Sequence, residues 1–122
     1  MAIEAPVKIK PEQLARALVD EASDRKASDI VLLDLQSISI ISDYFVICTG
    51  TSERQINTLV RAFLDRAAER GIKSKRIEGT SDGGWVLIDF EDVIVHVFSP
   101  EQRAFYRLDE LWKDAQPLLV IQ

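Results

Sequence analysis

The sequence predicts one α/β or α+β domain in which a mixed five-stranded sheet is flanked by helices. A length of 122 residues suits a single domain, and a 47% hydrophobic content is enough for one ordinary core. Strand-like and helical patterns alternate along the chain, which is typical of layers of helices on a sheet. We expect this domain over residues 11–116, between an N-terminal arm (1–10) and an apolar tail (117–122) that packs against the domain or a second copy.

The first part of the chain predicts one helix and two strands. The helix begins at Pro11, because proline fits the first turn, and apolar residues recur at helical spacing up to Ala22. The short, apolar, β-branched run Ile30–Leu33 is typical of a buried strand. The second strand is Tyr44–Thr49, whose continuous apolarity indicates cover on both faces. The turn between the two strands contains an unusual number of apolar residues: Ile38, Ile40 and Ile41.

The next element is a long amphipathic helix. Gly50 permits a tight exit from the preceding strand, and Ser52 and Gln55 have the spacing of a capping box. Apolar residues then follow the i, i+3, i+4, i+7 pattern from Ile56 to Ala68. Gly71 is expected to close the helix in the left-handed conformation that glycine tolerates.

The second half of the chain predicts an edge strand, a hairpin and a final helix. Lys75–Glu78 is short and polar, as edge strands often are. Trp85–Phe90 and Val93–Phe98 are separated by two acidic residues and therefore predict a β-hairpin. Cap and proline signals at residues 99–102 predict a helix through Tyr106, and Asp109–Trp112 can add another turn.

Composition narrows the functional classes. A net charge of −5 argues against the basic stripe that direct nucleic-acid binding requires, and it suits a basic protein partner. No apolar run has the length of about 20 residues that is needed to cross a bilayer. The N-terminus lacks the pattern of a secretory signal. Cys48 is the only cysteine, so an intramolecular disulfide is impossible and we expect a cytoplasmic protein.

The turn Gly50-Thr51-Ser52 is a candidate phosphate site, because a helix N-terminus presents free N–H groups and a partial positive charge. The alternative is that Ser52 only caps the helix. One glycine is no phosphate-binding fingerprint, so we favour the cap.

Other polar residues give weak signals for metal binding or catalysis. Two of the clustered carboxylates Asp89, Glu91 and Asp92 can share a magnesium ion, but acidic residues are also common in solvated turns. His96 is the sole histidine, and without a second histidine or a cysteine partner a zinc site is not expected. Cys48 lies inside an apolar strand, as inert buried thiols do. We therefore predict no catalytic residue, no cofactor and no metal.

Trp85 is the residue that we single out. It follows two glycines at the start of a strand, and tryptophan is a common anchor of protein interfaces. The alternative is that Trp85 fills the core beside Leu87, and the residues alone leave both readings open. Arg103, Tyr106 and Arg107 on the final helix either extend the same patch or cover it.

Several stretches, in the same order, closely resemble the ribosomal silencing factor S (RsfS) family, also called the Iojap family. The resemblance covers the chain from Pro11 to Asp114. It rests on Ser42–Ser52, Glu78-Gly79, Trp85–Asp89, Asp92–Phe98, Arg103, Phe105-Tyr106 and Leu111-Trp112.

The resemblance implies both a fold and a function. The fold is a nucleotidyltransferase-like core without the catalytic acids. The function is binding to ribosomal protein number fourteen of the large subunit, which blocks joining of the small subunit by bulk and lowers translation, notably in poor nutrients. The resemblance also implies a link to large-subunit maturation and homodimers in isolation. The alternatives are a nucleotide-binding or nucleotidyl-transfer enzyme using Gly50-Thr51-Ser52, and a self-associating cytosolic domain.

The family pattern also suggests which residues dock on the ribosomal protein. Matching positions of the hairpin and its neighbours are Trp85, Asp92, His96, Glu78, Arg103 and Tyr106, with Trp85 as the main anchor. Glu91 departs from the pattern, because the family usually has glycine at this turn position. If the position requires a positive φ, glutamate costs roughly 1 kcal/mol there.

Overall fold

The computed structural model describes residues 9–111 and 113–122. Most of the predicted N-terminal arm and Trp112, the end of the predicted extra turn, lie outside these residues. In the described part of the chain, no helix is long and apolar enough to cross a membrane.

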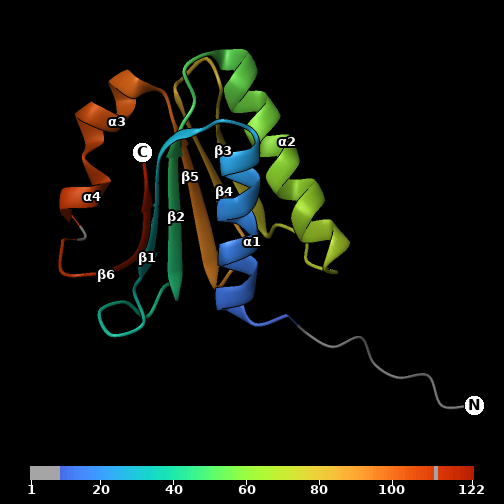
Figure 1. The fold of residues 1–122 in the computed structure, drawn as a ribbon, viewed down its shortest axis with the longest axis vertical. Helices are drawn as coiled ribbons and strands as arrows, with labels where there is room; N and C mark the ends of the chain where they lie inside the picture. The colour runs from blue at the N-terminus through green and yellow to red at the C-terminus, as the bar shows by residue number, and fades with distance from the viewer. Residues whose placement is uncertain (1–8, 112) are drawn as a thin grey trace, which may run out of the picture.

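One mixed sheet of six strands forms the centre of the fold, in the order β3-β4-β5-β2-β1-β6 (Figure 1). The strands are β1 (Ser28–Asp34), β2 (Tyr44–Thr49), β3 (Arg76–Thr80), β4 (Trp85–Asp89), β5 (Val93–Phe98) and β6 (Gln116–Ile121). Neighbouring strands are antiparallel except for the central pair, β5 and β2, which run parallel. The predicted mixed α+β class is therefore confirmed, and β3 is an edge strand as predicted.

The predicted count of five strands is wrong by one, because the apolar tail forms β6. This strand pairs with β1 in antiparallel register, with Leu119 opposite Leu32 and Val120 opposite Val31. Pro117 does not prevent this pairing, because proline is tolerated in an edge strand, where one side of the backbone has no neighbour to bond. The tail thus packs against its own chain.

Two long helices cover one face of the sheet and two short ones lie at the opposite face (Figure 1). The helices are α1 (Pro11–Asp24), α2 (Glu53–Glu69), α3 (Pro100–Tyr106) and α4 (Leu108–Leu111). The predicted cap of α2 is present, since the Gln55 amide donates to Ser52 Oγ at 3.0 Å. Gly71 adopts a φ of +76° just after α2, as the sequence predicted.

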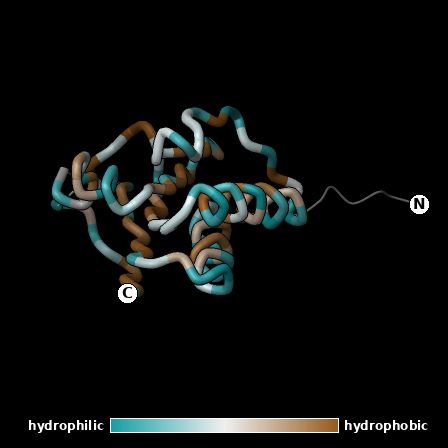
Figure 2. Tube along the Cα trace, turned by 90° about the horizontal axis from the view of Figure 1, so that it is seen from above, coloured by the Kyte–Doolittle hydropathy of each residue, from teal (hydrophilic) through white to brown (hydrophobic). Residues whose placement is uncertain are grey.

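Alternation along the central strands divides the core into two layers. The three valines of β5 face α1 and α2, whereas Ile94, His96 and Phe98 face the side of α3. Every residue of β2 is buried, which agrees with the predicted cover on both faces. Figure 2 shows strands that are mostly hydrophobic and helices that alternate between hydrophobic and hydrophilic positions, in keeping with one buried helix face.

Candidate functional site

An aromatic cluster lies on the α3 side of the sheet. We use this term for Trp85, His96, Phe98 and Tyr106. Trp85 begins β4 directly opposite Phe98, and their rings stack with centroids 4.9 Å apart. Tyr106, at the end of α3, brings its ring centroid to 4.4 Å from that of Trp85. Residues from two strands and a helix therefore converge on one indole ring.

A hydrogen bond inside the cluster fixes His96 in its neutral form. Trp85 Nε1 donates to His96 Nδ1 at 3.2 Å, so the ring proton of His96 resides on Nε2. His96 is only 4% exposed, and burial lowers its pKa to about 4. Its Nε2 atom has no hydrogen-bond partner among the described residues. A histidine in this state positions the indole ring and is poorly suited to act as a general base near neutral pH.

Trp85 itself is half-buried, so it is partly a core residue and partly available to a partner, the two alternatives that the sequence left open. One part of its ring packs on the aromatic cluster, and another part lines a small groove of about 190 Å³ beside Leu87 and Gly79. Gly79 has a φ of +84°, and a Cβ added there would overlap the Trp85 carbonyl oxygen. Glycine is thus required for β3 to approach Trp85.

Glu78 supplies the charge at this groove. It pairs with Leu87 across β3 and β4, and its side chain is 57% exposed. The Arg76 guanidinium lies 3.7 Å from its carboxylate, and such an exposed ion pair contributes little to stability. The groove therefore joins an apolar floor to an accessible carboxylate, a combination that fits the stem and charged head of a basic side chain.

Arg103 connects α3 to the end of the sheet. Its Nη1 donates to the Asp29 carbonyl oxygen at 2.6 Å and to Thr49 Oγ1 at 3.0 Å. Because Tyr106 is three residues further along the same helix, Arg103 helps to hold Tyr106 over the indole ring. This predicted site residue supports the cluster from beside it.

Asp92 lies away from the aromatic cluster, at the opposite end of the β4–β5 hairpin. Five residue steps along β5 separate the two ends, which corresponds to about 17 Å. The Asp92 carbonyl oxygen accepts hydrogen bonds from Ser42 Oγ at 2.9 Å and from the amides of Asp43 and Tyr44 at 3.0 Å. The neighbouring Glu91 has a φ of +79°, so the turn has the strained geometry that a glycine would relieve. The six predicted site residues thus form one group around Trp85 plus an isolated Asp92.

In the candidate phosphate turn, polar groups of Thr51 and Ser52 already form hydrogen bonds within the chain. Gln55 Oε1 accepts from the Thr51 amide at 2.7 Å and from Thr51 Oγ1 at 3.1 Å, while Ser52 caps α2. The adjacent cavity of about 380 Å³ is lined by three acidic residues, Glu53, Asp82 and Glu101. These carboxylates disfavour a phosphate group.

At the acidic turn between β4 and β5, Asp89 already has partners within the chain. The Asp89 carboxylate accepts the Glu91 amide at 2.7 Å and pairs with Arg76 Nε at 3.3 Å. Within the described residues, no three His, Cys, Asp or Glu side chains are placed to hold a metal ion. Burial raises the pKa of the Cys48 thiol to about 12, which keeps this thiol protonated and inert.

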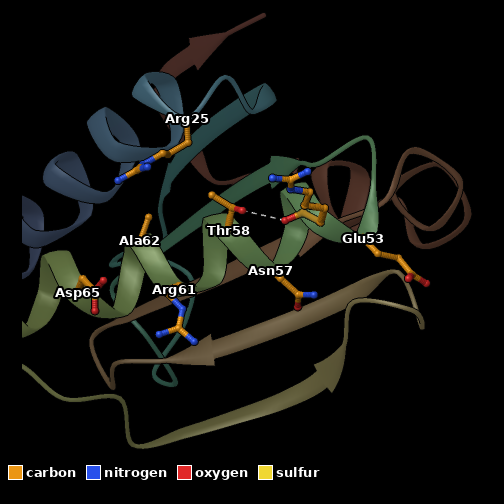
Figure 3. A pocket seen from close by; sticks show the side chains of 8 residues that line it. Arg25, Glu53, Asn57, Thr58, Arg61, Ala62 and Asp65 are labelled. Carbon is orange, nitrogen blue, oxygen red and sulfur yellow. Dashed lines mark hydrogen bonds between the residues drawn. The ribbon is translucent and has the colours of Figure 1, made fainter.

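The outer face of α2 carries a separate, polar cavity of about 530 Å³ (Figure 3). Arg25, Arg54 and Arg61 line it together with Glu53 and Asp65. The charges nearly balance, and Thr58 Oγ1 is already bonded to the Arg54 carbonyl oxygen at 2.9 Å. This arrangement offers no nucleophile with an adjacent base.

We use the term Trp85 surface for the aromatic cluster together with Glu78, Leu87 and Phe105. The six predicted docking residues leave out three of its members. Phe98 carries the stacked indole, Leu87 forms the groove floor, and Phe105 is 76% exposed beside Tyr106. For Phe98 and Leu87 a signal was available, since period-2 alternation places Trp85 with Leu87, and His96 with Phe98, on one face of the hairpin. Phe105 gave no such signal, because its exposure depends on how α3 sits on the sheet.

Comparison with known proteins identifies the family. The family model described as "Ribosomal silencing factor during starvation" (RsfS) matches residues 8–121. The protein named ribosomal silencing factor RsfS from Bacillus subtilis is 46% identical over 92 residues, which cover 75% of this chain and 78% of that protein. The protein of the same name from Halalkalibacterium halodurans is 43% identical over 104 residues, covering 85% of this chain and 89% of its own. The chloroplastic protein Iojap of maize is 36% identical over 104 residues, covering 85% of this chain and 45% of that longer protein.

Solved structures agree with these matches. A crystal structure of a protein from Chromobacterium violaceum superposes with a TM-score of 0.82 at 30% identity, covering 86% of this chain and 88% of that one. A protein from Bacillus halodurans gives a TM-score of 0.73 at 42% identity, covering 83% of this chain and 94% of that one. The agreement of family model, sequence relatives and structures shows that the chain belongs to the RsfS family of ribosomal silencing factors.

Proposed function

We propose that this protein is a non-catalytic ribosomal silencing factor of the cytoplasm. It docks on ribosomal protein number fourteen of the large subunit and blocks joining of the small subunit. The observation that carries this proposal is the half-buried Trp85, held by the aromatic cluster beside an apolar groove with a carboxylate at its edge. Family membership supports the ribosomal target.

The Trp85 surface has the features of an interface anchor. Its ring is fixed by stacking on Phe98 and by the bond to His96, so little conformational freedom is lost when a partner binds. Tryptophan is among the residues that most often dominate binding energy. The carboxylate of Glu78 and the net charge of −5 suit a basic ribosomal protein.

Inhibition by bulk requires only that the bound protein be large and rigid. A compact chain of 122 residues has a radius of gyration of about 14 Å, hence a diameter of roughly 35 Å. A body of this size on the joining face keeps the two subunits apart without any chemical step. The nucleotide-using alternative gains no support from the Gly50–Ser52 turn, whose cavity is acidic.

Co-sedimentation with isolated large subunits tests the proposal. The wild-type protein is expected to sediment with large subunits and to lower the yield of joined ribosomes in a gradient. Trp85→Ala is expected to weaken binding by roughly 2 kcal/mol or more, at least about thirtyfold, as truncation of an interface anchor does.

Because Trp85→Ala also removes packing, a surface variant is needed beside it. Glu78→Lys reverses an exposed charge at the groove and is expected to weaken binding with little effect on folding. Glu101→Lys makes the same charge change at an exposed position of α3 away from the groove and serves as the matched control. Equal binding by Glu78→Lys and Glu101→Lys would remove the groove from the proposal, and failure of the wild type to sediment would refute the ribosomal role itself.

A further inference from the structure

The loop between β1 and β2 exposes a group of isoleucines that the Trp85 surface does not use. Ile40 is 104% exposed, Ile41 is 75% exposed and Ile38 is 41% exposed. We call residues 36–42 the isoleucine loop. It extends from the lower end of the sheet toward the side of α4, away from α1 and α2 (Figure 1). Contiguous apolar side chains of this kind mark interaction sites on protein surfaces.

Hydrogen bonds hold the isoleucine loop in a defined conformation. The Leu35 amide donates to the Asp43 carbonyl oxygen at 2.8 Å, which closes the base of the loop. The Ile38 amide donates to the Leu35 carbonyl oxygen at 3.0 Å, and the Ile41 amide to Ser39 Oγ at 3.1 Å. The loop therefore presents its isoleucines from a fixed backbone, which lowers the entropic cost of binding.

Three aspartates lie next to the base of this apolar loop, and we call them its acidic rim. Asp34 and Asp43 flank it in sequence, and Asp92 is joined to it through the bond from Ser42 Oγ to the Asp92 carbonyl oxygen. None of these three aspartates forms an ion pair with another described residue. Burial and the negative charges of Glu12, Asp34 and Asp43 raise the pKa of nearby Tyr44, which indicates a locally negative potential.

The charge of Asp34, Asp43 and Asp92, the acidic rim of the loop, indicates which kind of partner can cover the isoleucines. A twofold contact between two copies of the loop would place like charges against each other, which costs free energy. An anionic membrane surface would be repelled for the same reason. A basic protein with an apolar recess is complementary to both the charge and the apolar tip.

We propose that the isoleucine loop is a second docking element, which inserts Ile40 and Ile41 into an apolar recess bordered by Lys or Arg on a basic protein of the large subunit. This proposal rests on the proposed function, which identifies the large ribosomal subunit as the binding partner. The loop and Trp85 lie at opposite ends of the central strands, about 17 Å apart along the strand direction. Contacts at two such points would fix the orientation of the protein on the subunit, which one anchor cannot do. Asp92, isolated from the aromatic cluster, gains a role as part of the rim.

The test compares two sets of serine substitutions. The double variant Ile40→Ser/Ile41→Ser removes both exposed tips, and Ile77→Ser removes an isoleucine that is 46% exposed on β3, at a distant edge of the sheet. Neither change touches the buried core, so urea unfolding is expected to show near wild-type stability for both. The double variant is expected to bind large subunits about a hundredfold more weakly in co-sedimentation, because each of the two buried isoleucines contributes roughly a factor of ten. Ile77→Ser is expected to bind like the wild type.

A charge variant tests the rim separately. Asp92→Asn is expected to weaken binding several-fold at low salt. It is also expected to make the affinity less dependent on salt, because the variant has a weaker electrostatic attraction for salt to screen. Asp65→Asn, on the exposed face of α2, is the matched control and is expected to have no effect.

The outcomes separate this proposal from the proposed function. Wild-type binding by the double variant, together with loss of binding by Glu78→Lys, would overturn the loop proposal and leave ribosomal docking intact. Failure of the wild type to bind would overturn both. If the double variant instead loosens a dimer measured by light scattering, or loses binding to phosphatidylcholine–phosphatidylglycerol vesicles, the loop serves a second copy or a membrane and the proposal is wrong.

Discussion

The neutral state of His96 makes the stability of the fold sensitive to mild acid. The unfolded chain is expected to protonate this histidine near pH 6.5, whereas burial in the aromatic cluster lowers its pKa to about 4. Between these values the unfolded state binds more protons, so the free energy of unfolding falls as the pH falls. From pH 7 to pH 5 the loss amounts to about 2 kcal/mol, and it approaches about 3 kcal/mol at pH 4.

Two measurements check this expectation. Urea unfolding at pH 5, 6 and 7 gives the free-energy change, in a range where most carboxylates remain ionised in both states. Because His96 is the only histidine, one imidazole resonance in an NMR titration reports its pKa directly. The variant His96→Gln removes the titrating group, and its stability is expected to be flat over the same range. A histidine midpoint near 6.5 in the folded protein, or an equal pH slope in His96→Gln, would refute the reasoning.

Three further substitutions test the backbone and the support of the site. Glu91→Gly is expected to raise the free energy of unfolding by about 0.5–1 kcal/mol in urea titration, because φ at this turn is +79°; an unchanged midpoint would contradict the strain. Gly79→Ala is expected to destabilise the protein by more than about 2 kcal/mol, since the added Cβ overlaps the Trp85 carbonyl oxygen, and a wild-type melting temperature would show that β3 can move aside. Arg103→Gln is expected to lower the free energy of unfolding by about 1–2 kcal/mol, because its hydrogen bonds to the end of the sheet are lost. It is also expected to increase the quenching of tryptophan fluorescence, as α3 loosens over the indole ring. Unaltered quenching would show that Arg103 has no positioning role.

Local patterns in the sequence were sufficient for most of the fold. The Ser52 cap, the left-handed Gly71 and the edge position of β3 each follow from residues within a few positions of one another. The sixth strand could not be predicted in this way, because its pairing with β1 joins residues about ninety positions apart in the chain. Pro117 is a local signal against a central strand, but an edge strand such as β6 tolerates it.

The candidate site shows the same division. Chain pattern and family resemblance pointed to Trp85, but its half-buried state depends on Tyr106 from α3 and on the close approach of Gly79, which are tertiary contacts. Asp92 matched the family pattern, yet its distance from Trp85 along β5 appears only once the hairpin is folded. The docking role of all six residues remains a prediction that the binding experiments test.

The two outer strands of the sheet differ in how they discourage stacking of one molecule on the next. On one side, β3 alternates exposed charged residues, Arg76 and Glu78. On the other, β6 is uncharged, but Pro117 lacks an N–H and the pairing register shifts beside it. The charges of β3 and the missing N–H of β6 each disfavour pairing with an incoming strand. Concentrated protein is therefore expected to resist ladder-like fibril growth, and Pro117→Val would remove that safeguard from the apolar border.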